Sequence, residues 1–169
     1  MRFPPIALGV ALQLAFIMFA PHIQPSLLGF SLLPFAILLE TKADFESMAN
    51  DLNRKGVKAR APAAIVGKSG VKHEFAFALV PNGEKPKVVV DTELSVKEVE
   101  EMKVLKFYVK VFDVGPEKAV LCVSPRLSGR AATLAREYGI VVIEDEVPRK
   151  LIPMAAKLVD EIAAKRSSS

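Results

Sequence analysis

The chain has 169 residues, a length that fits one ordinary domain with an appendage. Its net charge of +4 is unevenly spread: residues 1–40 contain only Arg2 and Glu40 as charged groups, and the other 22 basic and 18 acidic residues follow. The single cysteine, Cys122, excludes a disulfide within the chain, which fits a reducing compartment. The composition therefore predicts two unlike parts, an apolar N-terminal segment and a charged soluble domain.

Two apolar runs make up the N-terminal segment. Residues 6–20 and 27–39 are almost free of polar groups, and the polar stretch 21–26 with its two prolines separates them. A membrane-spanning helix needs roughly 20 apolar residues. We therefore predict a membrane-embedded hydrophobic helical hairpin over residues 1–40, which makes membrane lipids a partner. One span with an interfacial piece, a signal peptide and a buried core helix are the alternatives. Arg2 and the basic domain would share one side of a hairpin, and the positive-inside rule makes that side cytoplasmic.

The rest of the sequence alternates between helix and strand signals. Apolar and alternating patterns predict strands at 57–66 (broken by Pro62), 73–80, 87–91, 119–124 and 140–143. Helical spacing and end signals predict helices at 44–56, 95–112, 127–138 and 151–164. Asp44 and Ser95 are the expected N-caps of the first two helices. The apolar stripe of the 95–112 helix comprises Val96, Val99, Met102, Leu105, Val109 and Phe112.

This order predicts an α/β class with a mixed β-sheet flanked by helices, because an early hairpin is followed by a parallel crossover. We place the α/β domain at 41–146. A C-terminal helix and a disordered tail follow at 147–169.

Three stretches resemble the restriction-endonuclease-like PD-(D/E)xK superfamily, and its Mrr-like branch in particular. The stretch 67–76 (GKSGVKHEFA) resembles the Gly-rich turn that leads into the strand bearing the catalytic aspartate. The stretch 88–93 (VVVDTE) resembles the strand that carries (D/E)xK, and 119–143 resembles the closing strand-helix-strand unit. The resemblance covers most of 42–146. It implies a nuclease fold that hydrolyses DNA phosphodiesters with Mg²⁺ held by carboxylates, with a lysine two residues beyond the second carboxylate.

The sequence departs from that family pattern at two positions. Ala76 stands where the family has its aspartate, and Glu93 stands where it has its lysine. The resemblance leaves Asp91, Glu74, Glu46, Glu93 and His73 as candidate catalytic residues, with Asp91 and Glu74 as candidate metal ligands. A solvated strand end at 91–93, and a His73 that fixes the 67–70 turn, are the structural alternatives.

Six cations lie within nineteen residues, and they could bind nucleic-acid phosphates or anionic lipid heads. They are Arg54, Lys55, Lys58, Arg60, Lys68 and Lys72. A plain solvated face is the structural alternative.

The leading hypothesis is a membrane-anchored, catalytically inactive nuclease-like domain with a degenerate active site, which serves as a binding or scaffolding module at the cytoplasmic membrane face. One alternative is an active Mg²⁺-dependent DNA endonuclease with a rearranged carboxylate site and a migrated lysine such as Lys68 or Lys72. A second is a structural membrane protein without a nucleic-acid role. DNA, a protein partner and a homo-oligomer are the further partners considered.

Overall fold

The structure is a computed structural model that describes the backbone of residues 25–81 and 85–164, and the side chains from residue 40 onward within those ranges. The chain divides into two compact units, Met1–Ala43 and Asp44–Ser169, which are described separately below. The first apolar run of the predicted hairpin, most of the 81–84 turn and the tail 165–169 lie outside the described residues.

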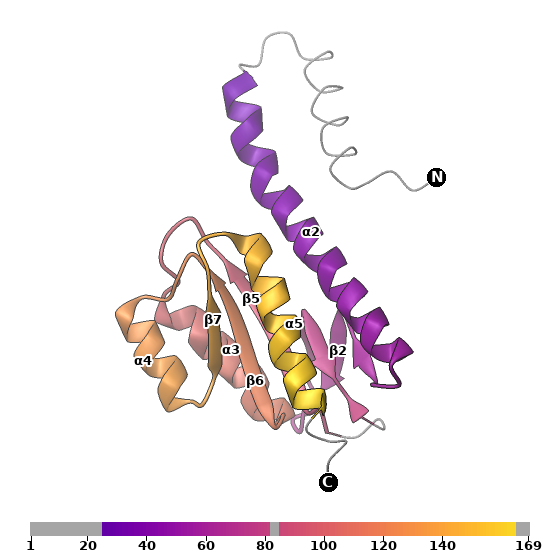
Figure 1. Ribbon diagram of the computed structural model, residues 1–169. Coiled ribbons are helices and arrows are strands. Elements are labelled where there is room, and N and C mark those ends of the chain that lie inside the picture. The colour runs from indigo at the N-terminus through magenta and orange to yellow at the C-terminus, as the bar shows by residue number, and fades with distance from the viewer. Residues whose placement is uncertain (1–24, 82–84, 165–169) are drawn as a thin grey trace. The chain divides into compact units, whose positions relative to one another are not determined.

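Helix α2 runs from Pro25 to Arg54 without a break (Figure 1). The prediction that a new helix starts at Asp44 is therefore wrong. Residues 40–44 contain no glycine or proline, so adding residues to an existing helix is easier than starting a second one. Among the residues that the structure describes, no helix combines the length and the apolar composition that crossing a membrane requires.

The larger sheet has five strands in the order β1-β4-β5-β6-β7. Their bounds are β1 Ala59–Arg60, β4 Phe77–Leu79, β5 Val88–Leu94, β6 Lys118–Ser124 and β7 Val141–Glu144. The pairs β1–β4 and β4–β5 are antiparallel, whereas β5–β6 and β6–β7 are parallel. This topology confirms the predicted mixed sheet.

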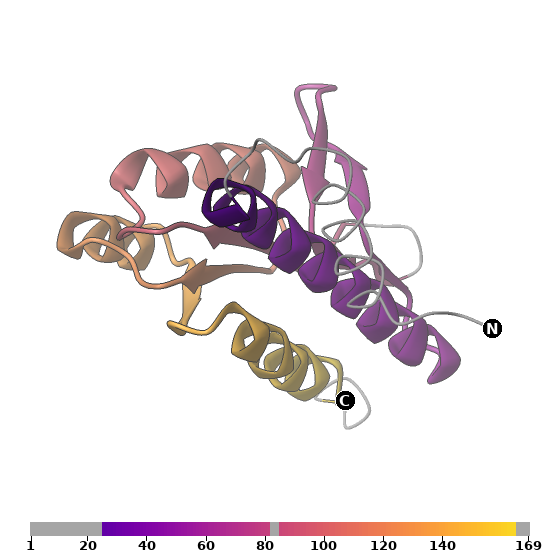
Figure 2. The same cartoon turned by 90° about the horizontal axis from the view of Figure 1, so that it is seen from above.

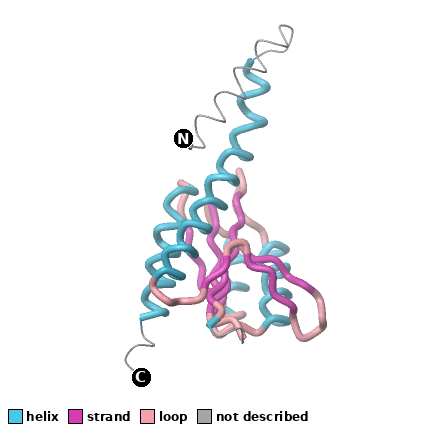
Figure 3. The backbone as a smooth tube through the Cα atoms, turned by 90° about the vertical axis from the view of Figure 1, so that its right-hand side faces the viewer, coloured by secondary structure: helices cyan, strands magenta, loops and turns pink. Residues whose placement is uncertain are grey.

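A separate two-stranded sheet pairs β2 (Ala63–Val66) with β3 (Lys72–Phe75) across the 67–70 turn (Figure 3). The predicted single strand 73–80 is therefore divided at Ala76. Phe75 belongs to the core on the α3 side of the large sheet, whereas Phe77 belongs to the core on the opposite side. Residues two apart on one strand share a face, so the chain must turn over at Ala76 to bury both rings on opposite sides.

Helices cover both faces of the five-stranded sheet (Figure 2). Helices α3 (Glu101–Val114) and α4 (Gly129–Glu137) pack on one face, where Val89, Leu121 and Phe107 are buried. Helix α5 (Pro148–Ala164) and the end of α2 pack on the other face, and there Phe45 stacks on Phe77 with ring centroids 6.3 Å apart. The alternation of buried side chains along β5 and β6 thus supplies two cores.

Helix α3 begins six residues later than predicted. Ser95 does not cap it, because the backbone N–H groups of Ser95 and Val99 donate to carbonyls of the segment after β6, at Ser124 and Arg126. Glu100 precedes the first helical residue, and Gly115, at φ 67°, ends the helix in the left-handed conformation that favours glycine.

The predicted apolar stripe of α3 is also largely wrong. Val99 is buried, but Val96 is 99% exposed, and three residues of the helical stripe, Met102, Val109 and Phe112, are 59%, 60% and 70% exposed. The face turned to the sheet instead buries Val104, Phe107 and Val114. The helix is apolar on two sides, so its sequence period alone does not tell which side meets the sheet.

Candidate functional site

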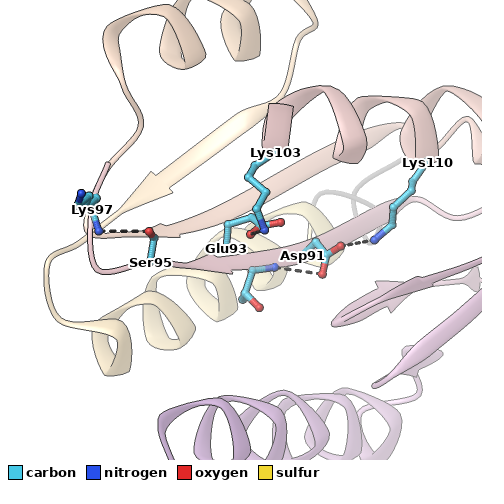
Figure 4. Close-up of polar contacts among 7 residues, drawn as sticks. Asp91, Glu93, Ser95, Lys97, Lys103 and Lys110 are labelled. Atoms are coloured by element: carbon cyan, nitrogen blue, oxygen red, sulfur yellow. Dashed lines mark hydrogen bonds and ion pairs between the residues drawn. The ribbon is translucent and has the colours of Figure 1, made fainter. Parts of the chain in front are cut away.

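The acidic end of β5 faces helix α3. Asp91 and Glu93 are two residues apart on one strand and therefore point to the same face. Lys110 Nζ lies 2.5 Å from Asp91 Oδ2, and Lys103 Nζ lies 2.9 Å from Glu93 Oε2 (Figure 4). Each predicted catalytic carboxylate of this strand is thus paired with a lysine of the following helix.

The Asp91–Lys110 pair is the less exposed of the two. The side chains of Asp91 and Lys110 are 24% and 28% exposed, whereas that of Lys103 is 52% exposed. Lys110 Nζ also lies 4.9 Å from the ring centroid of Phe75, within the range of a cation–π contact. Asp91 Oδ1 accepts a hydrogen bond from the backbone N–H of Thr92. Both oxygens of Asp91 are therefore already occupied within the fold.

The structure does not bring the remaining predicted carboxylates to Asp91. Glu74 is exposed on β3, and its strand neighbours His73 and Phe75 point the other way, toward α3. Glu46 is exposed on α2 and lines a pocket of about 410 Å³ with Asn53, Arg60 and other residues of the α2–β1 region. Within the described residues, no group of three or more His, Cys, Asp or Glu side chains is placed to hold a metal ion. This donor set does not fit Mg²⁺.

His73 takes part in a cluster that the sequence only half revealed. Its Nε2 donates to Asp113 Oδ2 at 2.6 Å, and the Ser69 hydroxyl donates to the same oxygen at 2.6 Å. The backbone N–H of Ser69 donates to Asp113 Oδ1 at 2.8 Å, and that of Lys68 donates to the Asp113 carbonyl. Asp113, at the end of α3, therefore fixes the 67–70 turn together with His73, which agrees with the structural alternative for that histidine.

Gly67 makes the approach of Asp113 possible. A Cβ on Gly67 would lie 1.9 Å from Asp113 Oδ2, closer than real atoms come. The hydroxyl of Ser69, then His73 and the Ser69 N–H, stabilise the charged carboxylate by hydrogen bonding and hold the pKa of Asp113 at about 2. Because Ser69 and His73 both bind the carboxylate and not each other, the arrangement stabilises the turn and does not form a nucleophile–base relay.

The six predicted cations are all exposed, but they belong to separate elements. Arg54 ends α2, where it pairs with Asp51, and Lys55 and Lys58 follow in the loop before β1, which holds Arg60. Lys68 lies in the β2–β3 turn, close to Gly115, and Lys72 begins β3. The run is therefore divided between the α2–β1 region and the β2–β3 hairpin.

Sequence reasoning missed Lys110, Lys103 and Asp113. A helix that crosses over between parallel strands runs antiparallel to the first strand. The late residue Lys110 therefore meets the early residue Asp91, and Lys103 meets Glu93. The i, i+7 spacing of the two lysines was the available signal.

Comparisons with known proteins give little more than this geometry. No protein-family model matches the chain, and no curated protein matches its sequence. Among solved structures, the chain is similar to a crystal structure of a protein of unknown function called AF1548, with 16% identity and a TM-score of 0.47. The match covers 60% of this chain and 56% of that one, so the chain spans little more than half the length of its neighbour.

Proposed function

We propose that the chain is a membrane-anchored, catalytically inactive nuclease-like domain that acts as a binding or scaffolding module at the cytoplasmic face of a membrane. The observation that carries the proposal is the pairing of Asp91 with Lys110 and of Glu93 with Lys103. Carboxylates that are committed to lysines stabilise the packing of α3 on β5, and they are not available to a divalent cation.

The departures from the restriction-endonuclease-like pattern support the same proposal. Ala76, where that family has its aspartate, lies between β3 and β4 and carries no ligand atom on its side chain. Glu93 replaces the lysine that would stabilise charge on the phosphate. The antiparallel β4–β5 pair followed by the parallel β5–α3–β6 crossover is compatible with that family's fold. Fold alone does not imply activity.

Membrane attachment rests on the sequence of the N-terminal segment, in which residues 3–39 lack a formal charge. In this proposal the exposed cations near the end of α2 face the anionic lipid heads of the cytoplasmic leaflet, at about 1 kcal/mol for each cation close to the surface. DNA is the other polyanion that such cations bind. Flotation of the full chain with anionic and neutral vesicles, beside DNA binding at several salt concentrations, distinguishes the two partners.

The decisive experiment for the missing activity is a cleavage assay. The purified full chain is incubated with supercoiled plasmid and Mg²⁺ or Mn²⁺, beside the variant Asp91→Ala. We expect no nicking above the level of the variant. Cutting by the wild type that disappears in Asp91→Ala would overturn the proposal.

A rearranged active site is the second candidate, and one observation favours it. Lys110 lies beside Asp91, so a carboxylate and a lysine do meet on one face of the sheet, although the lysine is neither Lys68 nor Lys72. In that case, removal of Lys110 would abolish cutting as completely as removal of Asp91.

A further inference from the structure

An apolar surface remains uncovered on the outer side of α3. Met102, Val109 and Phe112 are 59%, 60% and 70% exposed, and Leu105 between them is partly exposed. At 100° per residue, these four positions fall within an arc of about 80° on the helix. Single exposed apolar residues are normal on soluble proteins, but adjoining ones on one helix face mark an interaction site. We call these four residues the α3 stripe.

The spacing within the α3 stripe is symmetric. Its members follow at intervals of three, four and three residues, so the order reads the same in both directions from a midpoint at Phe107. If a second α3 lies antiparallel about a two-fold axis at that midpoint, Met102 meets Phe112 of the other copy, and Leu105 meets Val109. A two-fold interface requires such self-complementarity, whereas an unrelated partner does not. The first contact also matches a thioether with an aromatic ring, which is a favourable pair.

From this symmetry we propose that the α3 stripe is a homodimer interface, in which two copies of the chain pack their α3 helices antiparallel. The contact is a single helix pair, so the dimer is weak and reversible, as small interfaces are. The interface lies on the outer side of α3, away from the face that pairs with Asp91 and Glu93. The inference therefore does not depend on whether the domain is catalytic.

The model makes a specific statement about Lys106, which is exposed beside the α3 stripe. In the symmetric pair, Lys106 and its mate lie only about 3 Å apart along the helix axis, since they are one residue from the midpoint. The two ammonium groups repel each other, so salt strengthens the dimer by screening them. Binding of the same surface to anionic lipid would show the opposite salt dependence.

Disulfide crosslinking of the full chain tests the interface. We expect Lys106→Cys to form a crosslinked dimer on mild oxidation at least tenfold faster than Lys97→Cys, an exposed lysine outside the stripe. The native Cys122 is buried and does not interfere. Adding Val109→Ser should slow the Lys106→Cys crosslink about tenfold, whereas Val96→Ser, at a position that is 99% exposed, should leave it unchanged. Raising the salt should increase the rate.

Three outcomes would overturn the proposal. Equal crosslinking rates for the two cysteine variants would show that α3 is not at an interface between copies. A crosslink that is insensitive to Val109→Ser would show that contacts elsewhere hold the copies together. Protection of Lys106→Cys by anionic vesicles, with vesicle binding reduced by Val109→Ser and by salt, would identify lipid as the occupant of the stripe.

Discussion

Replacing Lys110 by methionine should destabilise the domain markedly. Met retains most of the length of the lysine side chain but removes its charge, so Asp91 loses the ammonium at its Oδ2. Exposed ion pairs contribute about 0–1 kcal/mol, whereas breaking a fully buried pair costs about 3–5 kcal/mol. With side chains 24% and 28% exposed, this pair lies between those limits, and we expect a loss of about 1–3 kcal/mol.

Urea or thermal unfolding of the full chain, followed by circular dichroism, measures this loss. The described part of the second unit runs from Asp44 to residue 164, and for a domain of that size each kcal/mol lowers Tm by about 3–5 °C. Lys103→Met is the matched control: its Glu93 pair is more exposed, so it should cost less than about 1 kcal/mol. A double-mutant cycle with Asp91→Asn isolates the coupling, which should be about 0.5–2 kcal/mol.

The sign of the Asp91→Asn effect separates a structural carboxylate from a catalytic one. A carboxylate that stabilises α3 against β5 costs stability when it is neutralised. A carboxylate kept for catalysis is held at the expense of stability, so neutralising it is neutral or stabilising. Stabilisation by Asp91→Asn, or a coupling near zero with Lys110→Met, would refute the reasoning.

Three further predictions concern the Asp113 cluster and the core. The pKa of Asp113 is lowered from 3.8 to about 2, so its stabilisation is fully present above about pH 4 and is lost as the pH falls toward 2; the Tm difference between wild type and Asp113→Asn should narrow over that window, and a constant difference would contradict the assignment. Gly67→Ala should destabilise by about 1–3 kcal/mol in urea unfolding, whereas Gly129→Ala, with no atom within 4 Å of the new Cβ, should not; equal effects would count against a close approach at Gly67. Burial raises the pKa of Cys122 to about 12, so the thiol should react with a disulfide reagent only as fast as the chain unfolds, and rapid labelling of the native protein at pH 8 would contradict this.

The strand and helix order was predictable because local signals agreed with the final packing. The continuous apolar strands β5 and β6 are buried on both faces by helices, so their sequences read as unbroken runs of valine and leucine. The end of α4 at Gly139 followed from a local chain-stopping signal.

Other features depended on tertiary contacts that no local pattern carries. The late start of α3 follows from the pairing of Val99 with the segment after β6. The division of 73–80 at Ala76 follows from two cores that claim neighbouring phenylalanines. At the candidate site, Asp91, Glu93 and His73 were visible as polar residues among apolar ones. Their partners Lys110 and Asp113 lie on a helix whose orientation toward the sheet had to be known first.

Divalent-cation binding at Asp91 tests the central claim most directly. Titration of the full chain with Mn²⁺, followed by electron paramagnetic resonance, counts bound ions in the wild type and in Asp91→Ala. If Asp91 is committed to Lys110, the two titrations should coincide, with only weak, salt-sensitive binding in both. A saturable Mn²⁺ site in the wild type that Asp91→Ala removes would contradict a structural role for Asp91 and favour an active metal site.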